Sequence, residues 1–392
     1  MDEHLMNTYA RLPVCFERGS GAWLWDAEGR RYLDALGGVA VCALGHAHPD
    51  ITAAIRDQAG QLVHTSNLYQ VRHQQTLGDR LTRLSGMDRA FFCNSGAEAN
   101  EAAIKIARRY ASGRNIAQPK IIVMEGSFHG RTLATLSATG NMKIQQGFGP
   151  LVEGFTRVPY NDVPAVEALS GDKSVVAVFV EPVQGEGGIN IPAADYLAAL
   201  RKLCDRNGWL LMLDEIQSGT GRTGRWFAFQ HAAILPDVLT CAKALGNGVP
   251  IGACLARGAA AELLQPGSHG STFGGNPLAT RAALAVLDVI ERDELLVRAA
   301  ALGERMLAGF RKNLGKTSGV KAVRGCGLLL GIELDRDCGE LVKLALAEGV
   351  LINVTAGRVI RLLPPYILTD AEADRIVEIV SALVQRFLGD VH

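Results

Sequence analysis

The sequence lacks the cysteine patterns of a metal site or a disulfide framework. Its eight cysteines, spread over 392 residues, form no CxxC pair and no zinc-like spacing. Cys241 and Cys254 stand among apolar neighbours, so we expect buried, reduced thiols of the kind found in the cytoplasm. The pattern argues against a zinc domain and against a small disulfide-linked fold.

Long apolar runs and an excess of charge of either sign are missing as well. No run approaches the roughly 20 apolar residues of a membrane-spanning helix. Residues 1–4 carry neither the basic region nor the apolar core of a signal peptide. Lysine plus arginine and aspartate plus glutamate both number 40, so no bulk field attracts nucleic acid or an anionic membrane. We therefore expect a cytoplasmic protein that binds small molecules.

The order of apolar and amphipathic segments predicts an α/β fold with two lobes. A chain of 392 residues exceeds the size at which one hydrophobic core usually stops growing. Short apolar runs that alternate with helical patterns predict a largely parallel sheet covered on both faces. These runs are 90–93, 121–124, 175–180, 209–213, 238–241 and 251–255. We predict a large domain at 48–290 and a small α/β domain formed by 1–47 and 291–392.

An acid and a lysine stand at the two ends of a glycine-rich stretch. The apolar run 209–213 stops at Asp214, and the carboxyl ends of buried strands are where open α/β sheets bind ligands. Lys243 is the only charged residue between positions 238 and 256, so desolvation would lower the pKa of its amine and make it a nucleophile. Taken alone, Asp214 also fits a turn residue and Lys243 a surface lysine.

Residues 94–98, Asn-Ser-Gly-Ala-Glu, join a predicted strand to the start of a predicted helix. Backbone N–H groups and the helix dipole at such a start favour an anion, and a phosphate suits them best. Residues 219–224 match the GxGxxG pattern, but no helix start follows them, so a dinucleotide site lacks its context. Residues 315–317 resemble part of a P-loop but lack the glycine at the Walker spacing.

Several side chains are suited to binding a planar ring or carboxylates. Phe128, which follows the second predicted strand, could stack on a ring, and Arg131 could hold a carboxylate through two hydrogen bonds. Glu186 lies in a glycine-rich loop, and Arg361 lies in an apolar segment where a charge must be paired or functional. A packed Phe128 and a surface Arg131 are the plain structural alternatives.

Two further pairs of residues bear on the chemistry. Ser271 and Thr272 are adjacent hydroxyls in a glycine-containing loop, suited to anion contacts. His46 and His48 have no accompanying Cys, His or Glu cluster, so we expect turn residues and no metal site.

Together, a phosphate loop, a stacking ring, a buried acid, a lysine nucleophile and carboxylate-binding arginines describe pyridoxal phosphate (PLP) chemistry.

Eight ordered motifs carry a resemblance that covers nearly the whole chain. They are GVAVCALGHAHP, FCNSGAEANEAAIKIAR, GSFHGRT, EPVQGEGG, LDEIQSGTGRTG, PDVLTCAKALGNGVPIGA, GSTFGGNP and VIRLLPP. The chain resembles the class III, omega-type aminotransferases of fold type I, and within them the acetylornithine aminotransferases. The resemblance implies the α/β PLP-transferase fold, with a mostly parallel central sheet in the large domain and a smaller α/β lobe formed by both chain termini.

The resemblance implies roles for residues around the cofactor ring. Lys243 would bind PLP covalently and, once free, would carry the proton between substrate and cofactor carbons. Asp214 would pair with the pyridinium nitrogen, Gln217 would contact the ring hydroxyl, and Phe128 would stack on the ring.

For the phosphate, the resemblance implies contacts from Ser95, Gly96 and Ala97, and from Thr272 of a partner subunit. The expected assembly is therefore a homodimer with shared active sites.

Arg131, Ser271, Glu186 and Arg361 would contact the substrates. An omega-amino donor has only a CH2 beside the reacting carbon, whereas 2-oxoglutarate has a carboxylate there. Arg361 would clasp that carboxylate in one half-reaction and pair with Glu186 in the other, because an unpaired buried arginine is costly. Arg131 would take the carboxylate at the far end of either substrate.

The implied activity is transfer of the δ-amino group of N2-acetyl-L-ornithine to 2-oxoglutarate by a ping-pong mechanism, in arginine biosynthesis. Succinylornithine, N-succinyldiaminopimelate or another omega-amino donor is the alternative, which the pocket near residues 39–42 and Ser271 would decide. No tyrosine stands near Val39, which modestly favours an acylated donor. A same-fold aminomutase and a nicotinamide dehydrogenase using residues 219–224 are more distant alternatives. Cys42, Asn247 and Phe273 depart from the family's usual pattern.

Overall fold

The computed structural model describes residues 4–389, and its largest sheet has seven strands. The strand order is β4-β10-β9-β8-β7-β5-β6. The strands are β4 (Arg89–Cys93), β5 (Lys120–Met124), β6 (Phe155–Val158), β7 (Val175–Val180), β8 (Leu210–Asp214), β9 (Val238–Cys241) and β10 (Gly252–Ala256). Every neighbouring pair is parallel except the two that β10 makes, with β4 and with β9. The predicted mostly parallel sheet is confirmed.

The central strands are buried on both faces, as their continuous apolar sequences require. On β8, Leu211 and Leu213 belong to the core cluster that includes helix α8 (Tyr196–Asn207). Leu210 and Met212 belong to the cluster that includes helix α4 (Gly96–Ser112). Because side chains alternate along a strand, Asp214 at the end of β8 faces the side that α4 covers.

Two four-stranded sheets form the rest of the β structure within residues 4–389, in the orders β1-β2-β3-β13 and β11-β12-β15-β14. Their strands are β1 (Phe16–Ser20), β2 (Trp23–Asp26), β3 (Arg31–Asp34), β11 (Val320–Cys326), β12 (Leu329–Leu334), β13 (Val350–Leu351), β14 (Asn353–Thr355) and β15 (Val359–Leu362). β3 and β13 pair in parallel, so the first and last parts of the chain share one sheet. This confirms a smaller α/β lobe formed by both termini, whereas the boundaries 48–290, 1–47 and 291–392 stay predictions.

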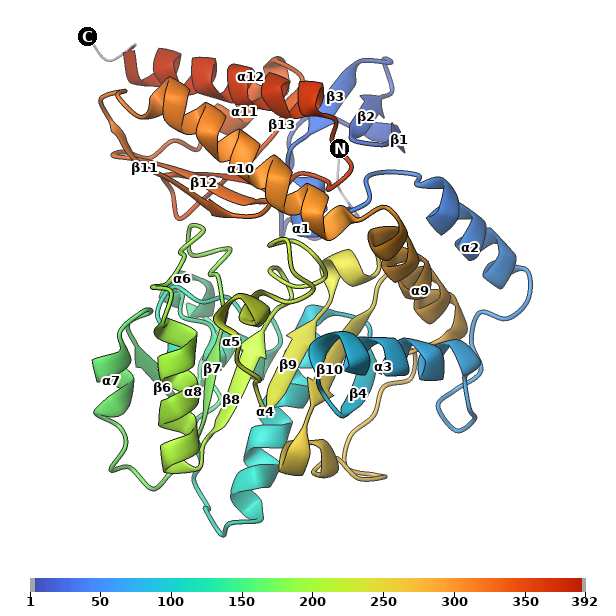
Figure 1. Cartoon of the computed structure of the whole chain (residues 1–392), viewed down its shortest axis with the longest axis vertical. Coiled ribbons are helices and arrows are strands. Elements are labelled where there is room, and N and C mark those ends of the chain that lie inside the picture. The colour runs from blue at the N-terminus through green and yellow to red at the C-terminus, as the bar shows by residue number, and fades with distance from the viewer. Residues whose placement is uncertain (1–3, 390–392) are drawn as a thin grey trace.

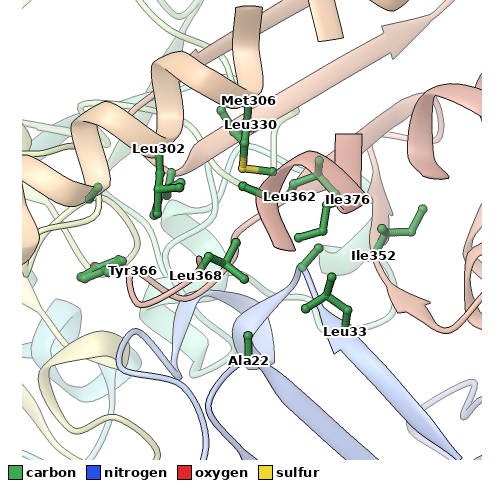
Figure 2. Close-up of a cluster of buried hydrophobic side chains, with 14 of the residues drawn as sticks. Ala22, Leu33, Leu302, Met306, Leu330, Ile352, Leu362, Tyr366, Leu368 and Ile376 are labelled. Atoms are coloured by element: carbon green, nitrogen blue, oxygen red, sulfur yellow. The ribbon is translucent and has the colours of Figure 1, made fainter. Parts of the chain in front are cut away.

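Helices α10 (Leu295–Leu314), α11 (Leu341–Ala347) and α12 (Asp370–Gly389) cover these small sheets in the upper part of Figure 1. Figure 2 shows that the core beneath them joins residues from both ends of the chain, all of them buried. The labelled side chains are Ala22, Leu33, Leu302, Met306, Leu330, Ile352, Leu362, Tyr366, Leu368 and Ile376. A capping box opens the last helix: Thr369 N donates to Glu372 Oε2 (2.9 Å) and Glu372 N donates to Thr369 Oγ1 (3.2 Å).

Helix α9 (Pro277–Arg292) runs between the two lobes at the right of Figure 1 and packs against α2 (Pro49–Ala59), α3 (Arg72–Ser85) and α10. The remaining helical elements are short. They are α1 (Gly37–Ala40), α5 (Leu133–Ala138), α6 (Met142–Gln145), α7 (Val163–Glu167) and the 3-10 turns η1 (Ala228–Ala232), η2 (Lys243–Leu245) and η3 (Gly258–Glu262). Among the helices of residues 4–389, none has both the length and the apolarity to cross a membrane.

All eight cysteines are free thiols, as expected. The expected burial of Cys241 and Cys254 is confirmed; Cys93, Cys204 and Cys338 are buried as well, whereas Cys42 and Cys326 are half-buried and Cys15 is exposed. Cys15 lies just before β1 in a segment of exposed and half-buried residues, where no core is available to cover it.

Candidate active site

A cavity of about 390 Å³ opens at the carboxyl edge of the large sheet. Its walls include segments that follow five mutually parallel strands, which is where open α/β sheets bind ligands. These segments are 94–97 after β4, 128–131 after β5, Glu181 and Glu186 after β7, Asp214, Ile216 and Gln217 after β8, and 242–243 after β9. The separate sequence motifs therefore meet at one place.

Most residues predicted from the sequence line this cavity. Those that line it are Ser95, Gly96, Ala97, Phe128, Arg131, Glu186, Asp214, Gln217 and Lys243. Arg361 borders it through its contacts with Glu186 and Gln217. Ser271 and Thr272 are outside the lining: Thr272 is exposed, and the Ser271 hydroxyl accepts a hydrogen bond from Asn94 Nδ2 at 3.2 Å.

Buried donors hold the Asp214 carboxyl group, which is only 4% exposed. Oδ2 accepts a hydrogen bond from Asn100 Nδ2 of α4 at 2.8 Å and lies 2.8 Å from His129 Nδ1. Oδ1 accepts from the backbone N–H of Ile216 at 3.1 Å. These contacts fix the direction in which the carboxyl group points. The carboxyl group lies on the face of the sheet that α4 covers because side chains alternate along β8.

Asn100 and His129 are site residues that sequence reasoning missed. The Asn100 amide also donates to the His129 carbonyl (2.7 Å) and accepts from Thr240 Oγ1 (2.8 Å). The His129 ring stacks on Phe179 with 4.1 Å between centroids, and its Nε2 is buried without a hydrogen-bond partner among the described residues. Both residues lie inside conspicuous motifs, beside residues with predicted roles, and this proximity is what marks them in the sequence.

Lys243 lies in the cavity wall with an unusual backbone conformation. Its φ is 46°, in the left-handed region, which costs a non-glycine residue about 1–3 kcal/mol. Removal from water lowers the pKa of its ammonium, and the nearby Glu186 partly opposes that shift. A lowered pKa raises the fraction of neutral amine, which is the nucleophilic form.

Glu181 is a second buried acid beside Asp214 that sequence reasoning did not assign. Burial, and then the charge of Asp214, raises its pKa to about 8. Oε1 accepts the backbone N–H of Phe128 at 2.9 Å, and Oε2 accepts that of Gly185 at 3.3 Å. Glu181 thus ties the loop bearing the aromatic ring to the loop bearing Glu186.

The start of α4 lies in the cavity wall, and a helix start of this kind favours an anion. Ser95 is the N-cap, and its Oγ accepts the backbone N–H of Glu98 at 3.2 Å. A Cβ added at Gly96 would lie 2.7 Å from Ile216 Cδ1, so only glycine fits there without displacing its neighbour. The first residues of this 17-residue helix, Gly96 and Ala97, line the cavity together with the N-cap Ser95.

Arg361 and Glu186 form an ion pair at the edge of the cavity. Arg361 Nη1 lies 2.5 Å from Glu186 Oε1; the arginine side chain is 1% exposed and that of the glutamate 34%. Nη1 also lies 3.4 Å from Gln217 Oε1, while Nε donates to Asn353 Oδ1 at 2.9 Å. The arginine is therefore fixed in the protein, whereas its acidic partner is partly open to solvent.

The model of the class-III aminotransferase family matches residues 5–384. The chain belongs to this family. The acetylornithine aminotransferase of Nitrosomonas europaea is 58% identical over 386 residues, which are 98% of each chain. The acetylornithine aminotransferase 1 of Bordetella parapertussis is 55% identical over 390 residues, 99% of each chain. The predicted family is confirmed.

Solved structures of class-III aminotransferases share the fold over nearly the whole chain. An ornithine aminotransferase from Toxoplasma gondii, with partially occupied PLP at its active site, superposes with a TM-score of 0.94 at 38% identity and covers 97% of this chain and 91% of its own. The N-acetylornithine aminotransferase of Stenotrophomonas maltophilia gives 0.85 at 36% identity, over 97% of this chain and 98% of its own. The predicted α/β PLP-transferase fold is confirmed.

Proposed function

We propose that this class-III aminotransferase moves the δ-amino group of N2-acetyl-L-ornithine to 2-oxoglutarate, with PLP as cofactor, as a step of arginine biosynthesis. The meeting of Lys243, Asp214 and the Arg361–Glu186 pair around one cavity carries the proposal. The acetylornithine aminotransferases that match at 55–58% identity over nearly the whole chain support this choice of donor.

The residues present fit a phosphorylated pyridine aldehyde. Gly96, whose missing Cβ leaves room for the Ile216 side chain in the cavity wall, would bind the phosphate through its backbone together with Ser95 and Ala97. Phe128 would stack on the ring, and Asp214, with its direction fixed by buried donors, would face the ring nitrogen. Bound PLP supplies an electron sink for the carbon that loses its proton.

Lys243 would carry the covalent attachment and the proton transfer. Its lowered pKa keeps part of the amine neutral, so it can bond to the cofactor aldehyde and later accept and return a proton at the reacting carbon. Gln217, in the same wall, would hydrogen-bond the ring hydroxyl while its Oε1 stays near Arg361.

The Arg361–Glu186 pair would let one site accept two unlike substrates. In the donor half-reaction Glu186 would keep Arg361 neutralised, because an unpaired buried guanidinium is costly. In the acceptor half-reaction the carboxylate beside the carbonyl of 2-oxoglutarate would replace Glu186 on Arg361. Arg131, exposed in the cavity wall, would bind the far carboxylate of either substrate.

A homodimer would complete the site with Ser271 and Thr272 of the partner subunit. Both residues lie outside the cavity of their own chain, in a loop whose Ser271 carbonyl accepts a hydrogen bond from Asn67 (3.0 Å). Exposed apolar side chains lie on that loop and on the 62–69 segment, which contacts it through Asn67. Such a group of side chains is expected where a second copy of the chain packs. These side chains are Leu62, Val63, Leu68, Tyr69 and Phe273.

We also propose the cytoplasm as the compartment and 48–290 as the large domain.

Ornithine is the second candidate donor, because the Toxoplasma gondii ornithine aminotransferase shares this fold closely. The pocket bears Val41, no tyrosine stands near Val39 in the sequence, and none of the described residues that line the cavity supplies a phenol for a free α-amino group. This favours the acylated donor, with succinylated donors as the nearest alternatives.

A donor panel tests the proposal. The purified holoenzyme should transfer amino groups to 2-oxoglutarate from N2-acetylornithine with a higher kcat/KM than from succinylornithine, N-succinyldiaminopimelate, ornithine or 4-aminobutyrate. Failure with N2-acetylornithine, or a clear preference for another donor, would overturn the proposed substrate. Glu186→Ala should slow at least one half-reaction, and rates unchanged from those of the unsubstituted enzyme in both half-reactions would contradict the switch. Lys243→Ala should abolish transfer and lose its cofactor on dialysis.

A further inference from the structure

We propose that Asn353 is a positioning residue that aims the Arg361 guanidinium at the acceptor and thereby sets selectivity for a 2-oxo acid. The inference rests on the proposed function, because it concerns how the same arginine meets the second substrate. Asn353 lies outside the cavity lining and would not touch either substrate.

The register of the small sheet places Asn353 directly beside Arg361. β14 and β15 are antiparallel with Asn353 opposite Arg361, and β12 places Gly331 opposite Arg361 on the other side. Directly opposed residues of antiparallel strands point to the same face. Arg361 is therefore flanked by one amide side chain and by one residue without a side chain.

The hydrogen bond from Arg361 Nε to Asn353 Oδ1 (2.9 Å) decides which edge of the guanidinium is free. A guanidinium can bind a carboxylate through two parallel N–H groups. With Nε occupied, the edge formed by Nη1 and Nη2 remains for a carboxylate, and Glu186 uses that edge through Nη1. An incoming substrate carboxylate would meet the same edge after Glu186 leaves, because the bond to Asn353 does not depend on Glu186.

The main chain around Glu186 is anchored to the same sheet, so the exchange needs only a side-chain rotation. Thr355 Oγ1, two residues after Asn353 on β14, donates to the Glu186 carbonyl. Arg324 Nη2 and Nε donate to the carbonyls of Gly188 (2.6 Å) and Ile189 (2.8 Å). The carboxylate of Glu186, 34% exposed, is the part left free to move.

Asn353→Leu removes the acceptor and keeps a similar side-chain volume. Without the Asn353 acceptor, the Arg361 guanidinium loses a charge-assisted hydrogen bond that fixes its plane. The value of kcat/KM for 2-oxoglutarate should therefore fall about ten-fold, mainly because KM rises. The donor half-reaction should stay within about two-fold of the unsubstituted enzyme, because Arg361 does not meet the donor. Both half-reactions of the holoenzyme are measured separately by the absorbance of bound cofactor.

Two further variants protect the test from folding effects. Asn353 is half-buried on an edge strand, and Asn353→Ala, which only truncates, should show the same selective loss if the leucine variant misfolds. Asn313→Leu removes an amide of the same lobe that bonds Ser381 (3.3 Å) away from the cavity, and both half-reactions should be unchanged.

Equal loss in both half-reactions, or no loss in either, would overturn the role of Asn353. Absence of N2-acetylornithine turnover in the unsubstituted enzyme would instead overturn the proposed function. The two failures are thus distinguishable.

Discussion

Asn100 supports the strongest stability prediction because three hydrogen bonds depend on one buried amide. It donates to Asp214 and to the His129 carbonyl, and it accepts from Thr240. Its side chain is 0% exposed, so no water can replace a lost partner. Asn100→Leu removes all three bonds with little change of volume.

The energies of these hydrogen bonds predict how much unfolding free energy each substitution removes. The bond to the Asp214 carboxyl group is worth about 1.5–3 kcal/mol and each of the other two about 1 kcal/mol, so Asn100→Leu should cost about 3–5 kcal/mol. Thr240→Val breaks one bond and should cost about 1–2 kcal/mol. For 392 residues, an unfolding entropy of about 2.1 cal/mol/K per residue converts 1 kcal/mol into about 1.2 °C of melting temperature.

Thermal unfolding of the holoenzyme, with saturating cofactor and fixed protein concentration, checks these values. The melting temperature should fall by about 4–6 °C for Asn100→Leu and about 1–2 °C for Thr240→Val. Thr240→Ser keeps the hydroxyl and removes only a methyl group, so it controls for packing. A fall for Asn100→Leu no larger than that for Thr240→Val would refute the reasoning that one amide joins three buried partners.

Two other predictions concern the loops around the cavity. Because the folded pKa of Glu181 is raised to about 8 from a usual value of about 4.3, the folded state retains a proton that the unfolded state has lost, and stability falls as pH rises between those values. Glu181→Gln should remove this slope, so its melting temperature relative to the unsubstituted enzyme should rise from pH 5 to pH 8; a relative fall would contradict the raised pKa. A Cβ at Gly185 would lie 1.9 Å from Gln217 Oε1. Gly185→Ala should therefore displace Gln217 and weaken cofactor binding about ten-fold by titration, with little change in melting temperature. Gly171→Ala, where a Cβ meets nothing within 4 Å, should leave cofactor affinity unchanged, and equal affinities for the two variants would disprove the displacement.

The sequence identified groups whose chemistry is unusual for their surroundings. Asp214 ends an apolar run, and Lys243 and Arg361 are charges in apolar segments, so each is visible without a structure. The family resemblance then supplied roles that spacing alone could not. The reversal of β10 was not predicted, because an apolar run of five residues carries no sign of strand direction.

The residues that orient these groups could not be found in the same way. Asn100, His129 and Asn353 are ordinary polar residues, and their partners lie 114, 85 and 8 positions away along the chain. Which polar residue meets which acid or arginine depends on helix rotation and on strand register. Neither is encoded in the chemistry of the residue itself.

Under the proposed function, strand register in the small lobe matters for substrate choice as much as the proposed catalytic residues of the large sheet. Lys243 and Asp214 come from the large sheet, whereas Arg361 comes from β15 of the small lobe. Since the side chains of a strand alternate, a slip of β14 by one residue against β15 would turn Asn353 to the face opposite Arg361. The bonds that hold the 186–189 segment to the same face, together with the pairing of Asn353 opposite Arg361, stabilise the register in which Asn353 meets the arginine. Under the proposed function, recognition of the second substrate thus depends on the pairing of two short strands.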